Sequence, residues 1–129
     1  AKMMIGSMWA NVNGDGNSND LHSHQSPAGS PVQVVLSGAY YVRVPGGSGA
    51  FIEEDYSHPQ RYLRHPFENA NPLNSYSMRI RPEEGRMLFF PSWMLHGVEQ
   101  SSCDEKRISI AFNITLRLQV DGIDRSPDQ

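Results

Sequence analysis

Three histidines have the types and spacing that could hold a metal ion. His22 and His24 are two residues apart, so in an extended segment both imidazoles project from one face and can reach the same ion. Two histidines in a polar loop are, however, more often exposed to solvent without a ligand. His96 lies in an otherwise apolar stretch, residues 93–98, where a lone histidine is more often a core residue. A late strand facing the first pair would bring the three together.

Arg107 and Ser109 are candidates for binding a carboxylate. They lie two residues apart on the strongest strand pattern, so both project from the same face. A buried guanidinium needs an anion because an unpaired charge is costly in a low-dielectric interior. A carboxylate fits its fork of donors in a bidentate manner, and the serine hydroxyl could add a hydrogen bond. Taken alone, Arg107 after Lys106 would be read as a solvated strand start.

The order of these residues resembles that of the Fe(II)- and 2-oxoglutarate-dependent oxygenases. It is most similar to a small family of them whose core reads W-x-N-x-N, H-x-H, L-S-G-x-Y-Y-V, F-P-S-W-x-x-H-x-V and R-I-S-I-A-F-N. All five motifs occur here in that order, at residues 9–13, 22–24, 36–42, 90–98 and 107–113. The resemblance covers about residues 9–118, and five ordered motifs are more specific than any one of them.

The resemblance implies a role for individual residues. His22, His24 and His96 would be the catalytic iron ligands, and Arg107 would grip the distal carboxylate of 2-oxoglutarate. The other cosubstrate-binding positions would be Ser109, Tyr41 and Asn113, and Asn11 and Asn13 would line the substrate side of the site. The implied reaction uses O₂ to hydroxylate a C–H bond of a small-molecule or peptide substrate, with release of succinate and CO₂.

The ligand set departs from the wider superfamily at His24. Most members have Asp or Glu there, giving two histidines and one carboxylate around Fe(II). Three neutral ligands leave the site one negative charge short, and Asp20 and Asp55 are the carboxylates that could compensate, although neither has the expected spacing. Three histidines also form a recognised zinc site. The sequence therefore leaves the metal open, with iron favoured because Arg107-x-Ser109 calls for a carboxylate cosubstrate.

The elements that must position these residues are strands. Residues 107–120 alternate apolar and polar side chains, the pattern of a half-buried strand. Shorter segments of similar character are residues 8–13, 32–44, 51–52, 76–81, 87–90 and 93–98, with polar turns at 14–20, 45–49 and 82–85. Glycine and proline make up 11 and 9 of the 129 residues, which suits many turns. We expect an all-β double-stranded β-helix (jelly roll) with few or no supporting helices, as one catalytic domain over residues 1–129.

A long segment without periodicity, residues 57–75, interrupts this pattern. Loops of this length inside a compact domain tend to be lids or binding loops, and the alternative is a disordered excursion. Its charged and aromatic residues Arg61, Tyr62 and Arg64 are the candidates for substrate contacts. Trp9 and Trp93 are read as core filling.

Composition excludes several classes of protein. With 11 basic and 14 acidic residues the net charge is −3, which argues against nucleic-acid binding. No apolar run approaches the roughly 20 residues of a membrane span. The single cysteine, Cys103, excludes an internal disulfide and favours a reducing, cytoplasmic setting.

The apolar side chains at alternate positions of residues 108–120 need a cover. The opposing sheet, a second subunit in a homodimer, or an N-terminal region absent from this sequence could each supply it. Exposed edge strands also favour a homodimer. We expect a catalytic core of nearly minimal size, with the strands that carry the metal and cosubstrate residues and few supporting elements.

Two other functions fit parts of the pattern. A cupin-like metalloenzyme that does not use 2-oxoglutarate would share the jelly roll and the three histidines. It should, however, have a glutamate soon after His-x-His, and residues 25–29 contain none. A non-catalytic jelly-roll binding module would bind no metal tightly, and replacement of its histidines would change only stability.

Overall fold

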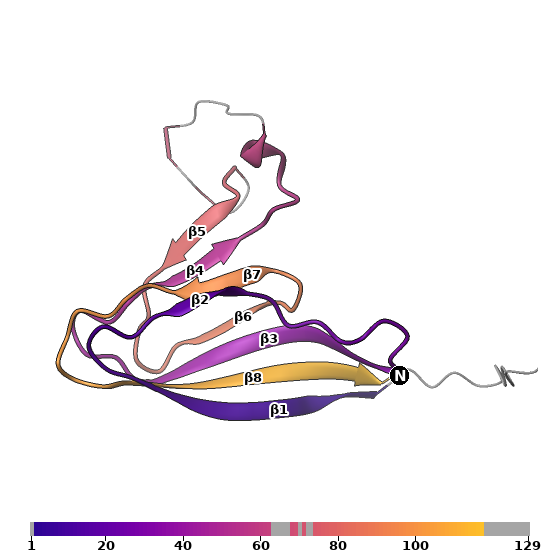
Figure 1. Cartoon of the computed structure of the whole chain (residues 1–129), viewed down its shortest axis with the longest axis horizontal. Coiled ribbons are helices and arrows are strands. Elements are labelled where there is room, and N and C mark those ends of the chain that lie inside the picture. Colours follow the sequence, from indigo (N-terminus) through magenta and orange to yellow (C-terminus); the bar gives the residue numbers. More distant parts are fainter. Residues whose placement is uncertain (1, 63–67, 70, 72–73, 118–129) are drawn as a thin grey trace, which may run out of the picture.

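The computed structural model describes residues 2–62, 68–69, 71 and 74–117, and these residues form two four-stranded antiparallel sheets. The strands are β1 (Lys2–Asn13), β2 (Asn19–His22), β3 (Val32–Arg43), β4 (Phe51–Glu54), β5 (Ser77–Ile80), β6 (Met87–Pro91), β7 (Leu95–Val98) and β8 (Arg107–Arg117). One sheet has the order β1-β8-β3-β6 and the other β2-β7-β4-β5, so successive strands alternate between the two layers except for β4 and β5, which form a hairpin in the second sheet (Figure 1). This confirms the expected double-stranded β-helix. Within the described residues the one helix is a single 3₁₀ turn, Pro59–Arg61.

β8 is an inner strand of the β1-β8-β3-β6 sheet, paired with β1 on one side and β3 on the other. Ser109 lies opposite Asn11 of β1 and Tyr41 of β3, so these three side chains share a face. The next residue, Ile110, projects to the other face. A one-residue slip would exchange the two faces, and the alternation of residue types along β8 makes such a slip costly.

The face of β8 that points toward the second sheet is the polar one. Arg107, Ser109 and Thr115 are each at most 8% exposed, whereas the apolar partners lie on the outer side of the sheet. Exposed residues on that outer side are Met3, Ile5, Met8, Val12, Met87 and Phe89, at 48–60%. The opposing sheet therefore does not cover the apolar face of β8. The expectation that it could do so, one of the three considered from the sequence, is wrong.

The sequence pattern did not predict strand β2 and predicted too short a strand for β1. β2 falls partly in residues 14–20, which were expected to be a turn, and it carries the polar sequence Asn-Asp-Leu-His. It is an edge strand that pairs with β7 alone, with His22 opposite His96. A four-residue edge strand needs no apolar alternation, so period-two patterning does not reveal it. β1 begins at Lys2, six residues before the expected start, because its mate β8 continues to Arg117.

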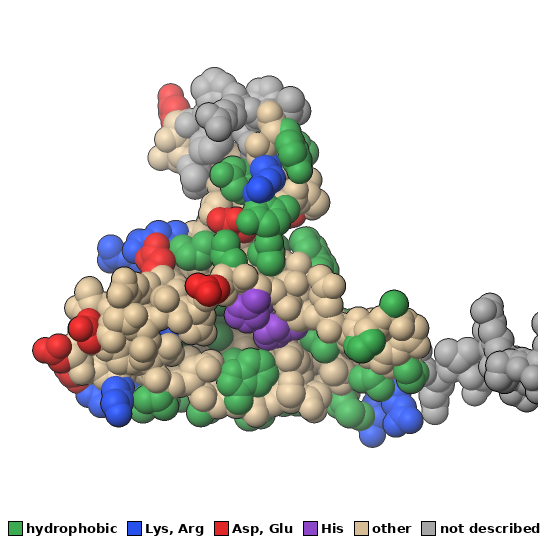
Figure 2. All heavy atoms as spheres, viewed as in Figure 1, with side chains coloured by type: hydrophobic (Ala, Val, Ile, Leu, Met, Phe, Trp, Pro, Cys, Tyr) green, Lys and Arg blue, Asp and Glu red, His purple; other side chains and the backbone are tan. Residues whose placement is uncertain are grey.

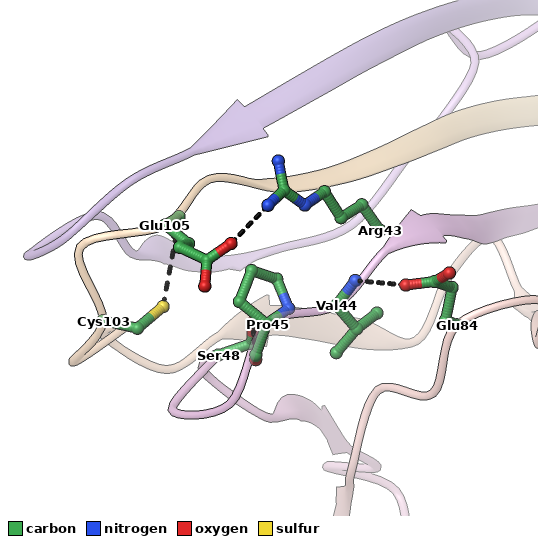
Figure 3. A network of polar contacts seen from close by, with 7 residues as sticks. All are labelled: Arg43, Val44, Pro45, Ser48, Glu84, Cys103 and Glu105. Atoms are coloured by element: carbon green, nitrogen blue, oxygen red, sulfur yellow. Dashed lines mark hydrogen bonds and ion pairs between the residues drawn. The ribbon is translucent and has the colours of Figure 1, made fainter.

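Short polar contacts tie together the turns that lead into β8, β4 and β6 (Figure 3). The Arg43 guanidinium pairs with the Glu105 carboxylate, and the Cys103 thiol donates to the Glu105 carbonyl. The Val44 N–H donates to the Glu84 carboxylate in the neighbouring turn. These exposed contacts link the three turns at the end of the fold where β8 begins with Arg107.

The described part of residues 57–75 connects β4 to β5, and these two strands tilt away from the rest of the molecule (Figure 1). The guanidinium of Arg61 stacks on the ring of Tyr56, with Cζ 3.7 Å from the ring centroid, and lies 5.8 Å from that of Tyr76. The turn is thus attached to the strands by a cation–π contact. Nowhere in the part of the chain described here is there a helix with the length and apolar character of a membrane span.

Gly49 is a position where the fold leaves no room for a side chain. A Cβ there would lie 1.8 Å from the Glu99 carbonyl oxygen, which is backbone and cannot move alone. We expect Gly49→Ala to lower the free energy of unfolding by roughly 3 kcal/mol, as overpacking does. Gly46→Ala in the same turn is the control, because nothing lies within 4 Å of its Cβ. Urea unfolding measures both, and equal stability of the two variants would contradict the close approach.

Candidate metal and cosubstrate site

A cavity of about 90 Å³ lies between the two sheets. Strands of both sheets line it, and every strand except β5 contributes a residue to its wall. The lining side chains or backbone belong to Trp9, Asn11, Asn19, His22, His24, Gly38, Ala39, Tyr41, Phe51, Phe90, His96, Gly97, Val98, Arg107, Ser109 and Ala111.

The three predicted histidines meet at one side of this cavity. One ring nitrogen from each of His22, His24 and His96 lies within 4.8 Å of the other two. The ring centroids are 4.4 Å apart for His22 and His96, 5.0 Å for His24 and His96, and 5.1 Å for His22 and His24. Figure 2 shows histidine side chains at the molecular surface in the region between the sheets. His22 is exposed and His96 is buried, so the cluster spans the opening of the cavity.

Each of the three rings has an oxygen partner on its Nδ1 atom. His22 Nδ1 lies 2.8 Å from the Asp20 carbonyl oxygen, and His96 Nδ1 lies 3.0 Å from that of Met94. His24 Nδ1 lies 2.6 Å from Oδ1 of Asn113. Carbonyl oxygens only accept, so these contacts place the ring proton on Nδ1 and leave Nε2 with a free lone pair. Three such nitrogens converging on one point form a donor set for a divalent transition metal.

His96 is the histidine of the cluster that the protein interior keeps in its neutral form. Its side chain packs against the rings of Phe51 and Phe90, which also contact each other, with centroid distances of 5.8 and 4.5 Å. Burial lowers its pKa to about 4, and the charges of His22 and His24 act in the same direction. At neutral pH the imidazole is therefore uncharged and able to donate its lone pair.

Neither expected compensating carboxylate joins the histidines. Asp20 contributes its backbone oxygen, and Asp55 accepts hydrogen bonds from Ser57. Within the described residues, the cluster that could hold a metal contains histidines alone. The strand register places a different acid, Glu53 of β4, directly opposite His96. Burial raises the pKa of Glu53.

Arg107 lies at the wall of the same cavity and is 2% exposed. Its Nη1 donates to the Gly49 carbonyl at 3.0 Å and its Nη2 to Oδ1 of Asn13 at 3.1 Å. Both partners are neutral, and Nε has no hydrogen-bond partner. Burial lowers the pKa of the guanidinium, and Tyr41 and Cys103 act in the opposite direction. A buried cation with neutral partners fits a site that receives an anion.

Tyr41 and Ser109 lie beside Arg107 on the cavity wall, at 2% and 4% exposure. They are direct cross-strand partners on β3 and β8, so their hydroxyls face the same space. Burial raises the pKa of the Tyr41 phenol, while the positive charge of Arg107 lowers it. Both side chains therefore present neutral hydroxyl groups next to the guanidinium.

The three predicted asparagines lie in three different places. Asn11 lines the cavity, as expected of a substrate-side residue. Asn13 lies behind the wall, 8% exposed, and accepts the hydrogen bond from Arg107. Asn113 is absent from the cavity wall and contacts His24 instead.

Two of the predicted substrate residues of the 57–75 segment, Arg61 and Tyr62, do not reach the cavity. Arg61 stacks on Tyr56, and Tyr62 is 74% exposed. Neither lines the space between the sheets. Arg64 falls outside the described residues.

Several wall residues were not predicted from the sequence. Trp9, read as core filling, is 39% exposed and lines the cavity, with its ring 5.8 Å from that of His24. It lies on the same face of β1 as Asn11, two residues away, so the W-x-N spacing contained the signal. Asn19, Phe51 and Phe90 complete the wall from other strands.

Comparisons with known proteins agree with this geometry. The family model described as "Putative 2OG-Fe(II) oxygenase" matches residues 7–113. A solved structure described as "Non-heme monooxygenase, ThoJ-Ni complex" is similar over 89% of this chain, with a TM-score of 0.56 and 13% sequence identity. This chain spans 46% of the length of that chain, and at this identity the likeness shows the fold alone. No curated protein matches.

Proposed function

This chain belongs to the 2OG-Fe(II) oxygenase family, and on that premise we propose that it is an Fe(II)- and 2-oxoglutarate-dependent dioxygenase that hydroxylates a C–H bond. The observation that carries the proposal is the pairing of two sites in one cavity. Three histidine nitrogens converge on one side, and a buried guanidinium with neutral partners lies on the wall. A metal-binding protein that did not use a dicarboxylate would have no need of the second site.

The donor set fits the metal. His22, His24 and His96 would hold Fe(II) through Nε2, because their Nδ1 atoms are committed to oxygen acceptors. Imidazole nitrogen suits iron as well as zinc, and three protein ligands leave positions for a cosubstrate and O₂. When bound, iron and 2-oxoglutarate would supply the activation of O₂, of which one oxygen atom enters the substrate C–H bond and the other enters succinate, with CO₂ released.

The protein residues around the cavity bind and orient the cosubstrate. Arg107 would hold the distal carboxylate with its fork, and the unpartnered Nε is available as a further donor. Tyr41 and Ser109 would add hydroxyl hydrogen bonds to the same carboxylate. Burial of all three excludes water, which strengthens each of these charge-assisted contacts.

The substrate would approach from the exposed side of the histidine cluster. His22 and Trp9 are both exposed there, and Asn11 projects into the cavity from the same strand as Trp9. An indole face next to a polar amide suits a small molecule or a peptide side chain with an apolar and a polar part. Arg61 is engaged with Tyr56, so it is a weaker candidate than Trp9 for this contact.

Anaerobic titration tests the proposal. Fe(II) is added to the protein and 2-oxoglutarate is then added, and we expect a visible charge-transfer band that saturates at one equivalent of each. Glutarate is the control, because it offers Arg107 the same distal carboxylate without the 2-oxo group that chelates iron. A folded protein that binds Fe(II) but gives no band with 2-oxoglutarate would exclude the cosubstrate and favour a cupin-like enzyme.

A further inference from the structure

The environment of His24 differs from that of the other two histidines. His22 and His96 each hydrogen-bond a backbone carbonyl two residues earlier in their own strand or loop. His24 Nδ1 instead lies 2.6 Å from a side chain 89 residues away, Oδ1 of Asn113 on β8. His24 is also the position where the wider superfamily has a carboxylate. The ring that replaces that carboxylate is thus oriented from the opposite sheet.

A second polar group lies next to the same nitrogen. Ser37 of β3 is 1% exposed, and its Oγ is 3.0 Å from His24 Nδ1. The Ser37 hydroxyl donates to Oδ1 of Asn113 at 2.7 Å. On its other side the Asn113 amide donates from Nδ2 to Oγ of Ser7 at 3.0 Å. Ser37 and Asn113 are strand partners, as are Ser7 and Asn113, so three adjacent strands fix this amide.

The direction of these hydrogen bonds determines which nitrogen of His24 carries the proton. Oδ1 can only accept, and it takes the hydroxyl proton of Ser37 away from the ring. Both oxygens next to Nδ1 therefore face it with lone pairs, and Nδ1 must be the protonated atom. Without the Asn113 carbonyl, the Ser37 hydroxyl would be free to donate to Nδ1. That change would move the ring proton to Nε2, the atom that faces the other two histidines.

We propose that Asn113 is a positioning residue for the metal site: its side-chain carbonyl fixes the orientation and the Nδ1–H tautomer of His24, and it does not bind the cosubstrate. The inference rests on the proposed function in one respect, because the metal is the ligand for which the tautomer matters. It revises the role that the sequence motif implied for Asn113. The absence of Asn113 from the cavity wall agrees with this assignment.

Three variants separate the contributions. Asn113→Leu keeps the branched shape of the side chain and has no acceptor, and we expect it to weaken Fe(II) binding by about 10- to 100-fold, the usual effect of losing a group that orients a metal ligand. Asn113→Asp keeps the acceptor, so affinity should be equal to or tighter than that of the wild-type protein. Ser37→Ala is the matched control, because Asn113 still accepts from His24, and affinity should stay within about twofold.

The second readout is the tautomer itself, measured in the metal-free protein by long-range ¹H–¹⁵N correlation spectra of the histidine rings. We expect His24 to be Nδ1–H in the wild-type, Asn113→Asp and Ser37→Ala proteins and Nε2–H in Asn113→Leu. A merely structural role for Asn113 would change thermal stability without this exchange of tautomers. Should the leucine variant fail to fold, Asn113→Ala removes the same oxygen.

Two results would overturn the inference. One is a wild-type His24 that carries its proton on Nε2, which would mean that the Asn113 amide has the opposite orientation. The other is an Asn113→Leu protein whose tautomer and Fe(II) affinity match the wild type. A wild-type protein that binds no Fe(II) would contradict the proposed function, and the spectra of the metal-free proteins would then still decide the role of Asn113.

Discussion

Replacement of His22 by Ala is expected to weaken Fe(II) binding by at least about 100-fold while hardly changing the stability of the metal-free protein. His22 supplies one of three converging nitrogens, and loss of a ligand costs more than loss of a group that only orients one. Its side chain is exposed on an edge strand, however, so truncation leaves no internal cavity. Calorimetric titration with Fe(II) under anaerobic conditions and urea unfolding measure the two quantities separately.

His22 is a cleaner choice than His96 for this experiment. His96 is 5% exposed and packs on Phe51 and Phe90, so its removal would combine metal loss with a core defect. His58→Ala is the control, because His58 lies outside the cluster of three. Tight Fe(II) binding by the His22→Ala protein would show that the metal site is elsewhere, and an equal loss in the His58 variant would show a non-specific effect.

Replacement of Arg107 by Met should weaken cosubstrate binding strongly while leaving the stability of the protein nearly unchanged, whereas a typical mutation of a buried residue mainly lowers stability. We expect the affinity for 2-oxoglutarate to fall at least about 100-fold, since the buried carboxylate would lose its charged partner. Fe(II) affinity should be unchanged, because Arg107 hydrogen-bonds Gly49 and Asn13 and none of the histidines. Titration of each ligand with the other held constant measures both affinities.

The stability of the Arg107→Met protein is the more unusual part of this prediction. Its guanidinium is 2% exposed and has neutral partners, so the ligand-free protein buries an uncompensated charge. Removing that charge offsets the two lost hydrogen bonds. The free energy of unfolding is therefore expected to fall by no more than about 1 kcal/mol, or to rise. Arg79→Met, which removes an exposed partner of Glu99, should change neither ligand affinity. Loss of Fe(II) binding in the Arg107 variant would mean that this residue supports the metal site.

The sequence predicted most strands because their residues alternate, and it predicted the histidines because their spacing matches a ligand pattern. The alternation by itself did not predict which face of β8 points inward. Apolar residues usually face the core, yet here Arg107, Ser109 and Asn113 face the second sheet, where the first two line the cavity and Asn113 contacts His24. The sequence motif that contains these three residues predicted correctly that their face of β8 points inward. Hydrophobic patterning alone would predict that the apolar face does so.

Other features depended on pairings between distant strands. The contact of Asn113 with His24 joins residues 89 positions apart, and the place of Glu53 beside His96 follows from the β4–β7 register. Neither register can be read from local composition. β2 was missed because an edge strand of four polar residues carries no periodic signal.

The polar interior between the sheets also has a consequence for the steady-state abundance of this protein in a cell. Among the described residues the buried apolar side chains are Tyr41, Ala50, Phe51, Phe90 and Phe112, and the buried polar ones include His96, Arg107 and Ser109 of the proposed metal and cosubstrate site. A ligand present at 100 times its dissociation constant adds about 2.7 kcal/mol to the stability of the folded state. Proteases degrade the unfolded fraction, so the steady-state abundance of this chain should follow the supply of iron and 2-oxoglutarate, with starvation for either shortening its lifetime.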